Sequence, residues 1–298
     1  MKSHDFSHTN LHCRPNSQDC DRMEVSFMMR ALWTGASGMI SQQTTLDTIS
    51  NNFSNINTAG YKKETAQFSS LLYSKIQSKV TDSEGNEKPV IGQVGSGVRV
   101  TGIVSSFTQG TLQESSNDWD LAIEGNGLFS VLDSDGNTAY TRNGSFRVAI
   151  GPQGATLANA DGYPVLDTNG QPIVFNKDWD ISKVTMDEYG NLMYPDDKNV
   201  AQRTNIQIGL TQFVNPAGLE KAGGSLFYET SASGAPLKEI ENTNLKQSKI
   251  HSGYLEASNV QTADEIVNLI VAQRAYEMNS KAITAADEML QQANNLRR

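Results

Sequence analysis

Two stretches of this chain, one near each end, carry apolar residues at intervals of seven. Seven residues make almost two turns of an α-helix, so residues at that spacing share one face. Each stretch therefore predicts a long helix whose apolar face needs a partner helix. The N-terminal stripe consists of Leu32, Met39, Leu46 and Phe53, and the C-terminal stripe consists of Leu269, Tyr276, Ile283 and Leu290.

The residues between the two stripes form short apolar runs separated by turn sequences. Asp135-Gly136 separates Leu128–Leu132 from Thr138–Thr141, which predicts a β-hairpin. Residues 206–210 alternate apolar and polar side chains, as a half-buried strand does. We therefore expect an α+β fold, in which N- and C-terminal α-helices form a coiled-coil-like helical domain and the centre is an antiparallel β-rich domain.

Local signals predict where the elements begin and end. The first helix runs from about Leu32 to Asn55, and Gly60 stops it. A shorter helical stretch follows over Glu64 to Ser74, and a strand begins at Val98. The resulting segments are a disordered tail (1–28), an N-terminal helical domain (29–76), a connecting segment with the first strands (77–116), a β-rich central domain (117–218), a return linker (219–252) and a C-terminal helical domain (253–298).

Bulk composition excludes two classes of function. The net charge of −9 leaves no basic stripe, so we expect no binding of nucleic acid. No stretch approaches the ~20 apolar residues of a membrane-spanning helix, and the N-terminus lacks the apolar core of a signal peptide. We expect no insertion into a membrane, and export only by a route that needs no cleaved signal.

The first 27 residues differ from the rest of the chain. They hold both cysteines, Cys13 and Cys20, and three of the four histidines, but the spacing matches no zinc-ligand pattern. We interpret this segment as a tail that precedes the natural start, which we place at Met28 or Met29 rather than at Met1 or Met23.

A search for catalytic or ligand-binding residues finds little. His251 is the only histidine after the tail, and no cysteine is present there to serve as a nucleophile. Asp133-x-Asp135-Gly136 has its glycine at the wrong position for a calcium loop, so we interpret it as a tight turn. Gly125-x-Gly127 is followed by a strand instead of a helix, so it predicts no phosphate site. We expect no enzyme activity, no cofactor and no metal.

Three blocks of residues, in order along the chain, resemble the bacterial flagellar rod and hook protein family. The first block runs from Asn51-Asn52 through Asn55 to Gly60-Tyr61-Lys62. The second comprises 121–129 and 140–146, and the third runs from Gly253 through Ser258-Asn259 to Gln273-Arg274 and Glu277. The opening Arg30 to Met39 resembles that of distal rod proteins. The connecting segment, between Leu72 and Gly97, lies where these proteins carry an insertion that hook proteins lack, and the chain is too short for a usual hook protein. Distal rod proteins are therefore the most similar class. Proximal rod and hook-type proteins remain alternatives.

The resemblance implies a structural subunit that assembles through its terminal helices into a helical tube and transmits torque. It implies contacts with further copies of itself, with other rod proteins, and with the hook and ring proteins of the basal body, after passage through the flagellar export apparatus. The residues that it assigns to assembly are the two stripes together with Asn51, Asn52, Asn55, Gly60, Ser258, Asn259, Gln273 and Arg274.

One alternative from another class stays open. A β-rich centre on a helical stalk would also suit a surface module that binds glycans. Such a module needs a groove lined by aromatic side chains, whereas Trp33, Trp119 and Trp179 are scattered along the chain. A hydrolase acting on the cell wall would have to rely on carboxylates alone.

Overall fold

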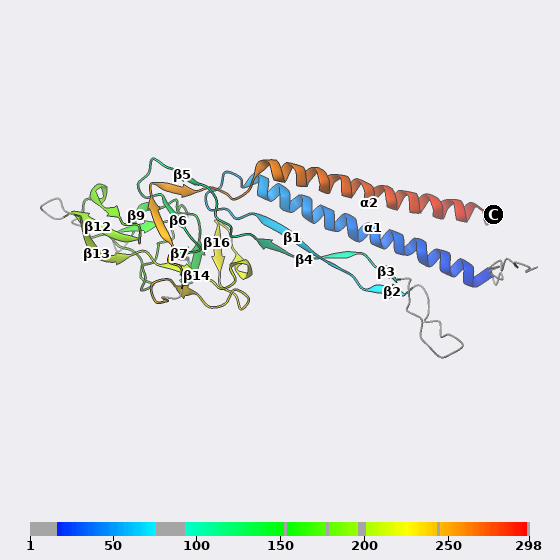
Figure 1. Cartoon of the computed structure of the whole chain (residues 1–298), viewed down its shortest axis with the longest axis horizontal. Coiled ribbons are helices and arrows are strands. Elements are labelled where there is room, and N and C mark those ends of the chain that lie inside the picture. The colour runs from blue at the N-terminus through cyan, green and yellow to red at the C-terminus, as the bar shows by residue number, and fades with distance from the viewer. Residues whose placement is uncertain are drawn as a thin grey trace, which may run out of the picture. The chain divides into compact units, whose positions relative to one another are not determined.

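The computed structural model describes residues 17–75, 93–151, 154–176, 179–195, 201–242 and 245–296. Along the chain, a helix near the N-terminus, α1 (Ser17–Ser54), precedes a region of antiparallel strands, and a helix near the C-terminus, α2 (Thr262–Leu296), follows it (Figure 1). The expected α+β fold is confirmed. The chain forms two compact units: one holds the described residues up to Thr44, Phe68–Thr101 and those from Val271, and the other holds Thr45–Gln67 and Gly102–Ile270.

The strands are short, and most are joined by tight turns. Two 3₁₀ helices, η1 (Ile181–Lys183) and η2 (Pro216–Gly218), interrupt them. The strands are β1 (Glu64–Ser70), β2 (Tyr73–Lys75), β3 (Gln93–Gly95), β4 (Val98–Ser105), β5 (Leu112–Glu114), β6 (Leu121–Glu124), β7 (Leu128–Leu132), β8 (Thr138–Thr141), β9 (Arg147–Gly151), β10 (Gly154–Ala158), β11 (Thr185–Met186), β12 (Asn191–Pro195), β13 (Ala201–Gln207), β14 (Leu210–Gln212), β15 (Glu220–Lys221), β16 (Leu226–Tyr228), β17 (Leu237–Lys238), β18 (Lys249–Ser252) and β19 (Tyr254–Glu256).

The largest sheet has six strands in the order β15-β16-β8-β7-β14-β17. Its centre is the β7–β8 hairpin, in which Phe129 lies opposite Thr141 and Leu132 lies opposite Thr138. Asp135 and Gly136 form the turn, with Gly136 at a φ of 79°, so the predicted hairpin is confirmed. Smaller sheets join β11-β12-β13, β9 to β10, β6 to β18, β5 to β19, β1 to β4 and β2 to β3.

The main hydrophobic core lies in the second unit and gathers side chains from both the large sheet and the smaller ones. Phe129 and Phe146 meet edge to face at its centre, with ring centroids 5.0 Å apart. Residues 206–210, expected to form one half-buried strand, are interrupted: β13 ends at Gln207 and β14 begins at Leu210. Gly209 lies in the interruption, where a Cβ would lie 2.6 Å from the carbonyl oxygen of Asp167.

Residues 219–252 were expected to be a linker without strands, and this expectation is wrong. They contain β15, β16, β17 and β18. Three of these strands complete the six-stranded sheet, and β18 pairs with β6. Its many glycine, serine and asparagine residues predict loops, but strands as short as two or four residues leave little periodicity for a sequence to show. The β-rich region therefore extends well beyond Gly218.

Helix α1 begins at Ser17, earlier than the predicted start near Leu32. Pro15 precedes this start, and no glycine or proline interrupts residues 17–34, so nothing local ends the helix before Gly35. The expected disordered tail is therefore wrong for residues 17–28, which are helical. Residues 1–16, including Cys13, lie outside the described residues.

The predicted short helix over Glu64 to Ser74 is wrong. These residues form β1 and β2, which pair with β4 and β3 respectively. The apolar spacing of Phe68, Leu71 and Leu72 suits a helix, but pairing with a distant strand overrides a weak local preference. The predicted strand beginning at Val98 is confirmed as β4. The polar run from Gln77 to Lys88 lies outside the described residues.

Within the first unit, α1 and α2 contact each other through glycines. A Cβ at Gly35 would lie 2.8 Å from Cγ1 of Ile283, and one at Gly38 would lie 2.8 Å from Nδ2 of Asn279. Because the residue numbers run in opposite directions, the two helices are antiparallel there. Two glycines in the middle of α1 thus allow a close approach of α2.

Candidate functional site

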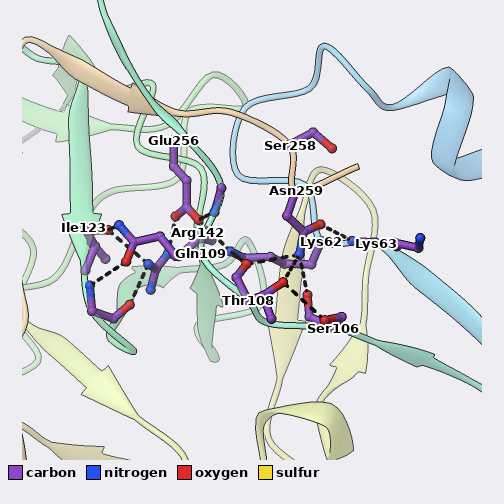
Figure 2. Close-up of polar contacts among 12 residues, drawn as sticks. Lys62, Lys63, Ser106, Thr108, Gln109, Ile123, Arg142, Glu256, Ser258 and Asn259 are labelled. Carbon is purple, nitrogen blue, oxygen red and sulfur yellow. Dashed lines mark hydrogen bonds and ion pairs between the residues drawn. The ribbon is translucent and has the colours of Figure 1, made fainter. Parts of the chain in front are cut away.

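A buried carboxylate in the second unit gathers the segments that carry the family motifs. Glu256 ends β19, and its side chain is 1% exposed. Its Oε1 accepts hydrogen bonds from Nζ of Lys62 at 2.6 Å and from the backbone N–H of Gly110 at 2.8 Å. Its Oε2 accepts one from Nε of Arg142 (Figure 2). One carboxylate therefore joins three segments that are far apart in the sequence.

Arg142 uses its remaining donors to hold a loop in place. Its guanidinium donates to the carbonyl oxygens of Ile123 at 3.0 Å and Gly125 at 2.7 Å, and also to that of Gly127. The turn between β6 and β7 thus wraps around this side chain. The planar fork of five donors explains why an arginine occupies this position.

Asn259 forms a second connection just beyond Glu256. Its Oδ1 accepts a hydrogen bond from the backbone N–H of Lys63 at 2.6 Å. Its Nδ2 donates to the carbonyl oxygens of Ser106 at 2.8 Å and Thr108 at 3.0 Å (Figure 2). The side chain amide therefore uses both its acceptor and its donors to join the segment after α1, the segment after β4 and the segment before α2.

The third connection lies at the ends of the helices, where Asn52 of α1 faces Glu265 of α2. Nδ2 of Asn52 donates to Oε2 of Glu265 at 3.2 Å and to the carbonyl oxygen of Glu64 at 2.8 Å. Oδ1 of Asn52 accepts from the N–H of Glu64 and the hydroxyl of Tyr61. Nζ of Lys63 lies 2.5 Å from Oε1 of Glu265, as an ion pair without hydrogen-bond geometry.

We call Asn52, Lys62, Lys63, Arg142, Glu256, Asn259 and Glu265 the polar cluster. Burial lowers the pKa of Lys62, and the neighbouring Glu256 carboxylate opposes that shift. Burial also raises the pKa of Tyr61, together with the charges of Glu64 and Glu265. Because Lys62 and Arg142 share the single carboxylate of Glu256, removal of that carboxylate would leave two buried cations uncompensated.

The structure separates the residues that the sequence assigned to assembly into two groups. Asn52, Gly60 and Asn259 make contacts within one chain: Gly60 has a φ of 70°, and its N–H donates to the carbonyl oxygen of Glu256 at 2.8 Å. Asn55 bonds back to Asn51, and Ser258 accepts from the N–H of Val260. These contacts fix the local conformation of the chain at the motif residues.

The stripe residues lie beside the contact between the two helices, and most of them are half-buried. Leu32, Met39 and Leu46 on α1, and Leu269, Ile283 and Leu290 on α2, are half-buried, whereas Phe53 and Tyr276 are exposed, as are Gln273 and Arg274. Other apolar residues of the two helices are exposed: Met29, Trp33 and Ile40 on α1, and Ile266, Val267, Ile270, Val271, Met278 and Met289 on α2.

The sequence analysis missed the central residues of the polar cluster, Lys62, Arg142 and Glu256. All three stand inside the motif blocks, but the sequence around a charged residue does not reveal whether it is buried or which charge it meets.

His251 and Gly125, which the sequence analysis dismissed as parts of a catalytic or phosphate site, have structural contacts. Nε2 of His251 lies 2.9 Å from Oε2 of Glu124 on the paired strand. Ser248 packs directly against Gly125, where a Cβ would lie 2.6 Å from the serine Oγ. Among the described residues, no group of three or more metal-ligating side chains occurs. No helix in the described ranges is long and apolar enough to cross a membrane.

A cavity of about 270 Å³ opens on the six-stranded sheet. Its aromatic lining is Tyr140 and Tyr189, whereas Trp119 and Trp179 pack against the core. Two tyrosines among otherwise aliphatic and polar lining residues give little support to the aromatic-lined groove that the glycan-binding alternative requires.

Comparisons with known proteins agree with this arrangement. Three family models match: Flagella basal body rod protein over residues 32–62, Flagellar hook protein FlgE/F/G D1 domain over 122–209, and Flagellar basal body rod FlgEFG protein C-terminal over 251–296. The polar cluster draws residues from each matched region. The three matched ranges include the motif blocks, apart from Leu121.

Full-length relatives extend the match to most of the chain. The flagellar basal-body rod protein FlgG of Borreliella burgdorferi is 42% identical over 272 residues, which cover 91% of this chain and 100% of the relative. FlgG of Caulobacter vibrioides is 41% identical, with 90% and 100% covered. FlgG of Agrobacterium fabrum is 39% identical, with 88% and 97% covered.

A β-rich body fastened by a buried polar cluster to a pair of terminal helices defines a class of axial structural proteins. This chain belongs to the flagellar basal-body rod protein family. It is a structural subunit of the flagellar basal-body rod and assembles with other flagellar components.

Proposed function

We propose that this chain is a distal rod subunit that polymerises through its terminal helices into a helical tube and transmits torque to the hook. Its similarity to rod proteins along 91% of its length supports this class. The opening from Arg30 to Met39 favours a distal rod protein, and the length of the chain argues against a hook protein. Neighbouring rod, hook and ring proteins are its proposed partners.

We infer that α1 and α2 pair as a coiled coil. The fully buried residues of α2 are Glu265, Ala272 and Ala286, which are spaced by seven or by fourteen. Leu269 and Ile283, fourteen residues apart, are half-buried between them. Two rows with heptad spacing, offset by four residues, are what a coiled-coil seam requires. The predicted stripe on α2 supplies one of these rows.

The observation that carries the proposal of a polymer is a second apolar face on α2. Ile266, Val267, Ile270 and Val271 are all exposed, and helical periodicity places them on the side away from Glu265 and Ala272. A helix that is apolar on both sides needs cover on both sides. One partner is α1 of the same chain, and we propose that neighbouring subunits cover the other side.

The export of this protein is a further part of the proposal. We propose that it crosses the envelope unfolded, through the flagellar export apparatus, without a cleaved signal peptide. Its body from Met29 onward contains no cysteine, so no disulfide can form there and block the passage of an extended chain.

Electron microscopy of the purified protein, concentrated at neutral pH with short rod fragments as seeds, tests the proposed polymer. We expect wild-type tubes and no tubes from Ile270→Asp, because a charge on the outer face of α2 resists burial. Ile150→Asp is the matched control, since Ile150 is an exposed isoleucine of the β9 strand. Wild-type protein that stays monomeric even with seeds would contradict the proposal.

A further inference from the structure

The cavity on the six-stranded sheet has a floor of hydroxyl groups. Tyr140, Ser130 and Thr211 line it, and they come from the adjacent strands β8, β7 and β14. The three residues are buried, between 4% and 7% exposed, and all belong to the second unit. Three hydroxyls from neighbouring strands therefore share one cavity.

These hydroxyls carry more hydrogens than the chain supplies acceptors. Oγ of Ser130 and Oγ1 of Thr211 lie 3.1 Å apart and share one hydrogen bond, so one of their two hydrogens has no acceptor among the described residues. The hydroxyl of Tyr140 has no hydrogen-bond partner in that part of the chain either. Burial and the charge of Glu229 raise the pKa of Tyr140 to about 12, so its hydroxyl remains a donor at neutral pH. The floor therefore offers two O–H donors to an occupant.

Apolar side chains form most of the walls around this floor. Leu166, Ile208 and Leu210 are buried beside the hydroxyls, whereas Tyr189 and Ile240 are about half exposed and lie at the rim. Apolar walls with a few converging polar groups are typical of a site for a small molecule. The volume of about 270 Å³ lies just below the usual range for drug-sized ligands, so the cavity suits a smaller molecule.

The charged residues of the lining disfavour an ionic ligand. The carboxylate of Glu239 accepts three hydrogen bonds from the side chain of Gln212 and from Ser248. The carboxylate of Asp167 accepts hydrogen bonds from N–H groups of its own turn. Both carboxylates already have donors, so they attract a cation only weakly, and they repel an anion. Lys238 also lines the cavity, but it is exposed and already forms an ion pair.

We propose that this cavity binds a small, neutral, largely apolar molecule through a carbonyl oxygen, which accepts hydrogen bonds from Tyr140 and from the Ser130–Thr211 pair. An aromatic amide belongs to this class: its ring lies between the apolar walls, and its carbonyl oxygen replaces water on the hydroxyls. The site uses no residue of the terminal helices or of the polar cluster, so it is independent of the proposed polymer.

Methyl NMR of the full-length protein, without seeds, tests the site with acetanilide as the probe. We expect saturable shifts of the Ile208 and Ile240 methyl signals and none for Ile150, an exposed isoleucine of β9 outside the lining. N-ethylaniline has the same ring and chain, with a methylene group in place of the carbonyl group. It should bind more weakly by about fivefold or more, because it leaves the buried donors unpaired.

Two tyrosine variants locate the recognition of the carbonyl group. Tyr140→Phe removes one donor and keeps the ring, which meets Phe213 edge to face at a centroid distance of 4.8 Å. We expect this variant to bind acetanilide about fivefold more weakly and N-ethylaniline as the wild type does. Tyr254→Phe is the matched control, because Tyr254 is an exposed residue of β19 outside the lining, and it should change neither affinity.

Three results would overturn the proposal. If acetanilide causes no saturable shift of the cavity methyl signals at millimolar concentrations, the cavity holds only water. If the two probes bind equally, or if Tyr140→Phe leaves the affinity for acetanilide unchanged, the hydroxyl floor does not recognise a carbonyl group. The proposed polymer would stand in each case, since the cavity is not part of it.

Discussion

At the scale of single residues, Glu256 has the largest structural role in the polar cluster. Its partner Lys62 is 194 residues away in the sequence, and Arg142 is 114 residues away. The carboxylate accepts from both, and its own backbone oxygen accepts from Gly60. This residue therefore holds the segment after α1 against the strand before α2.

We expect Glu256→Gln to destabilise the β-rich body by about 3–5 kcal/mol, because two buried cations would lose their shared counter-charge. Urea unfolding followed by tryptophan fluorescence measures this change. Glu188→Gln is the matched control: Glu188 forms an exposed ion pair with Lys249, and such pairs contribute about 1 kcal/mol at most. Equal effects of the two substitutions would show that the buried arrangement is not important for stability.

Gly60 allows a second prediction at this scale. A Cβ there would lie 2.6 Å from the backbone carbon of Arg142, and backbone cannot yield as a side chain can. Gly136 has a similar φ, 79° against 70°, but nothing lies within 4 Å of its Cβ position. We expect Gly136→Ala to cost about 1 kcal/mol for the left-handed conformation alone.

Gly60→Ala should cost at least twice as much as Gly136→Ala, because the steric clash adds to the same conformational cost. Urea unfolding of both variants gives the comparison directly. If the two free energies of unfolding matched, the close approach of Gly60 to Arg142 would be of no consequence.

At the scale of elements, the glycines of α1 determine how near α2 can come. Gly35 faces Ile283 across the helix pair, and a Cβ there would overlap its Cγ1 at 2.8 Å. Alanine is a better helix former than glycine by about 1 kcal/mol, so two effects oppose each other at this position.

We expect Gly35→Ala to leave the stability of the polymer nearly unchanged in the wild-type protein. In the Ile283→Ala protein, which lacks the clashing atoms, the same substitution should raise stability relative to Ile283→Ala alone. The dissociation temperature of assembled polymers, measured for both single variants and the double variant, gives the coupling. Effects that simply add would mean that these two residues do not contact each other in the assembled protein.

At the scale of the whole molecule, the terminal helices have more apolar surface than one partner helix can cover. We therefore expect the ends of the helices to be frayed in the free subunit and to become ordered on assembly. Circular dichroism at 222 nm should show a higher helical content per subunit in polymers than in monomers. Identical spectra would mean that the helices are already complete before assembly.

The sequence by itself determined the features whose causes are local. The 3.6-residue periodicity of an α-helix places residues spaced by seven on one face, so both terminal helices were predictable from Leu32 to Phe53 and from Leu269 to Leu290. The Asp135-Gly136 turn was equally predictable, because glycine tolerates the positive φ that the turn requires. Family membership followed from the motif blocks.

Only the tertiary structure decided which faces of the helices are covered and which charges meet. Strands β1 and β2 were mistaken for a helix because their pairing partners lie elsewhere in the chain, and the strands of 219–252 were too short to show a period. The meeting of Lys62, Arg142 and Glu256, and the exposure of Trp33 and Met278, depend on how distant segments pack. Long-range packing of that kind leaves no local pattern in the sequence, whereas helical periodicity does.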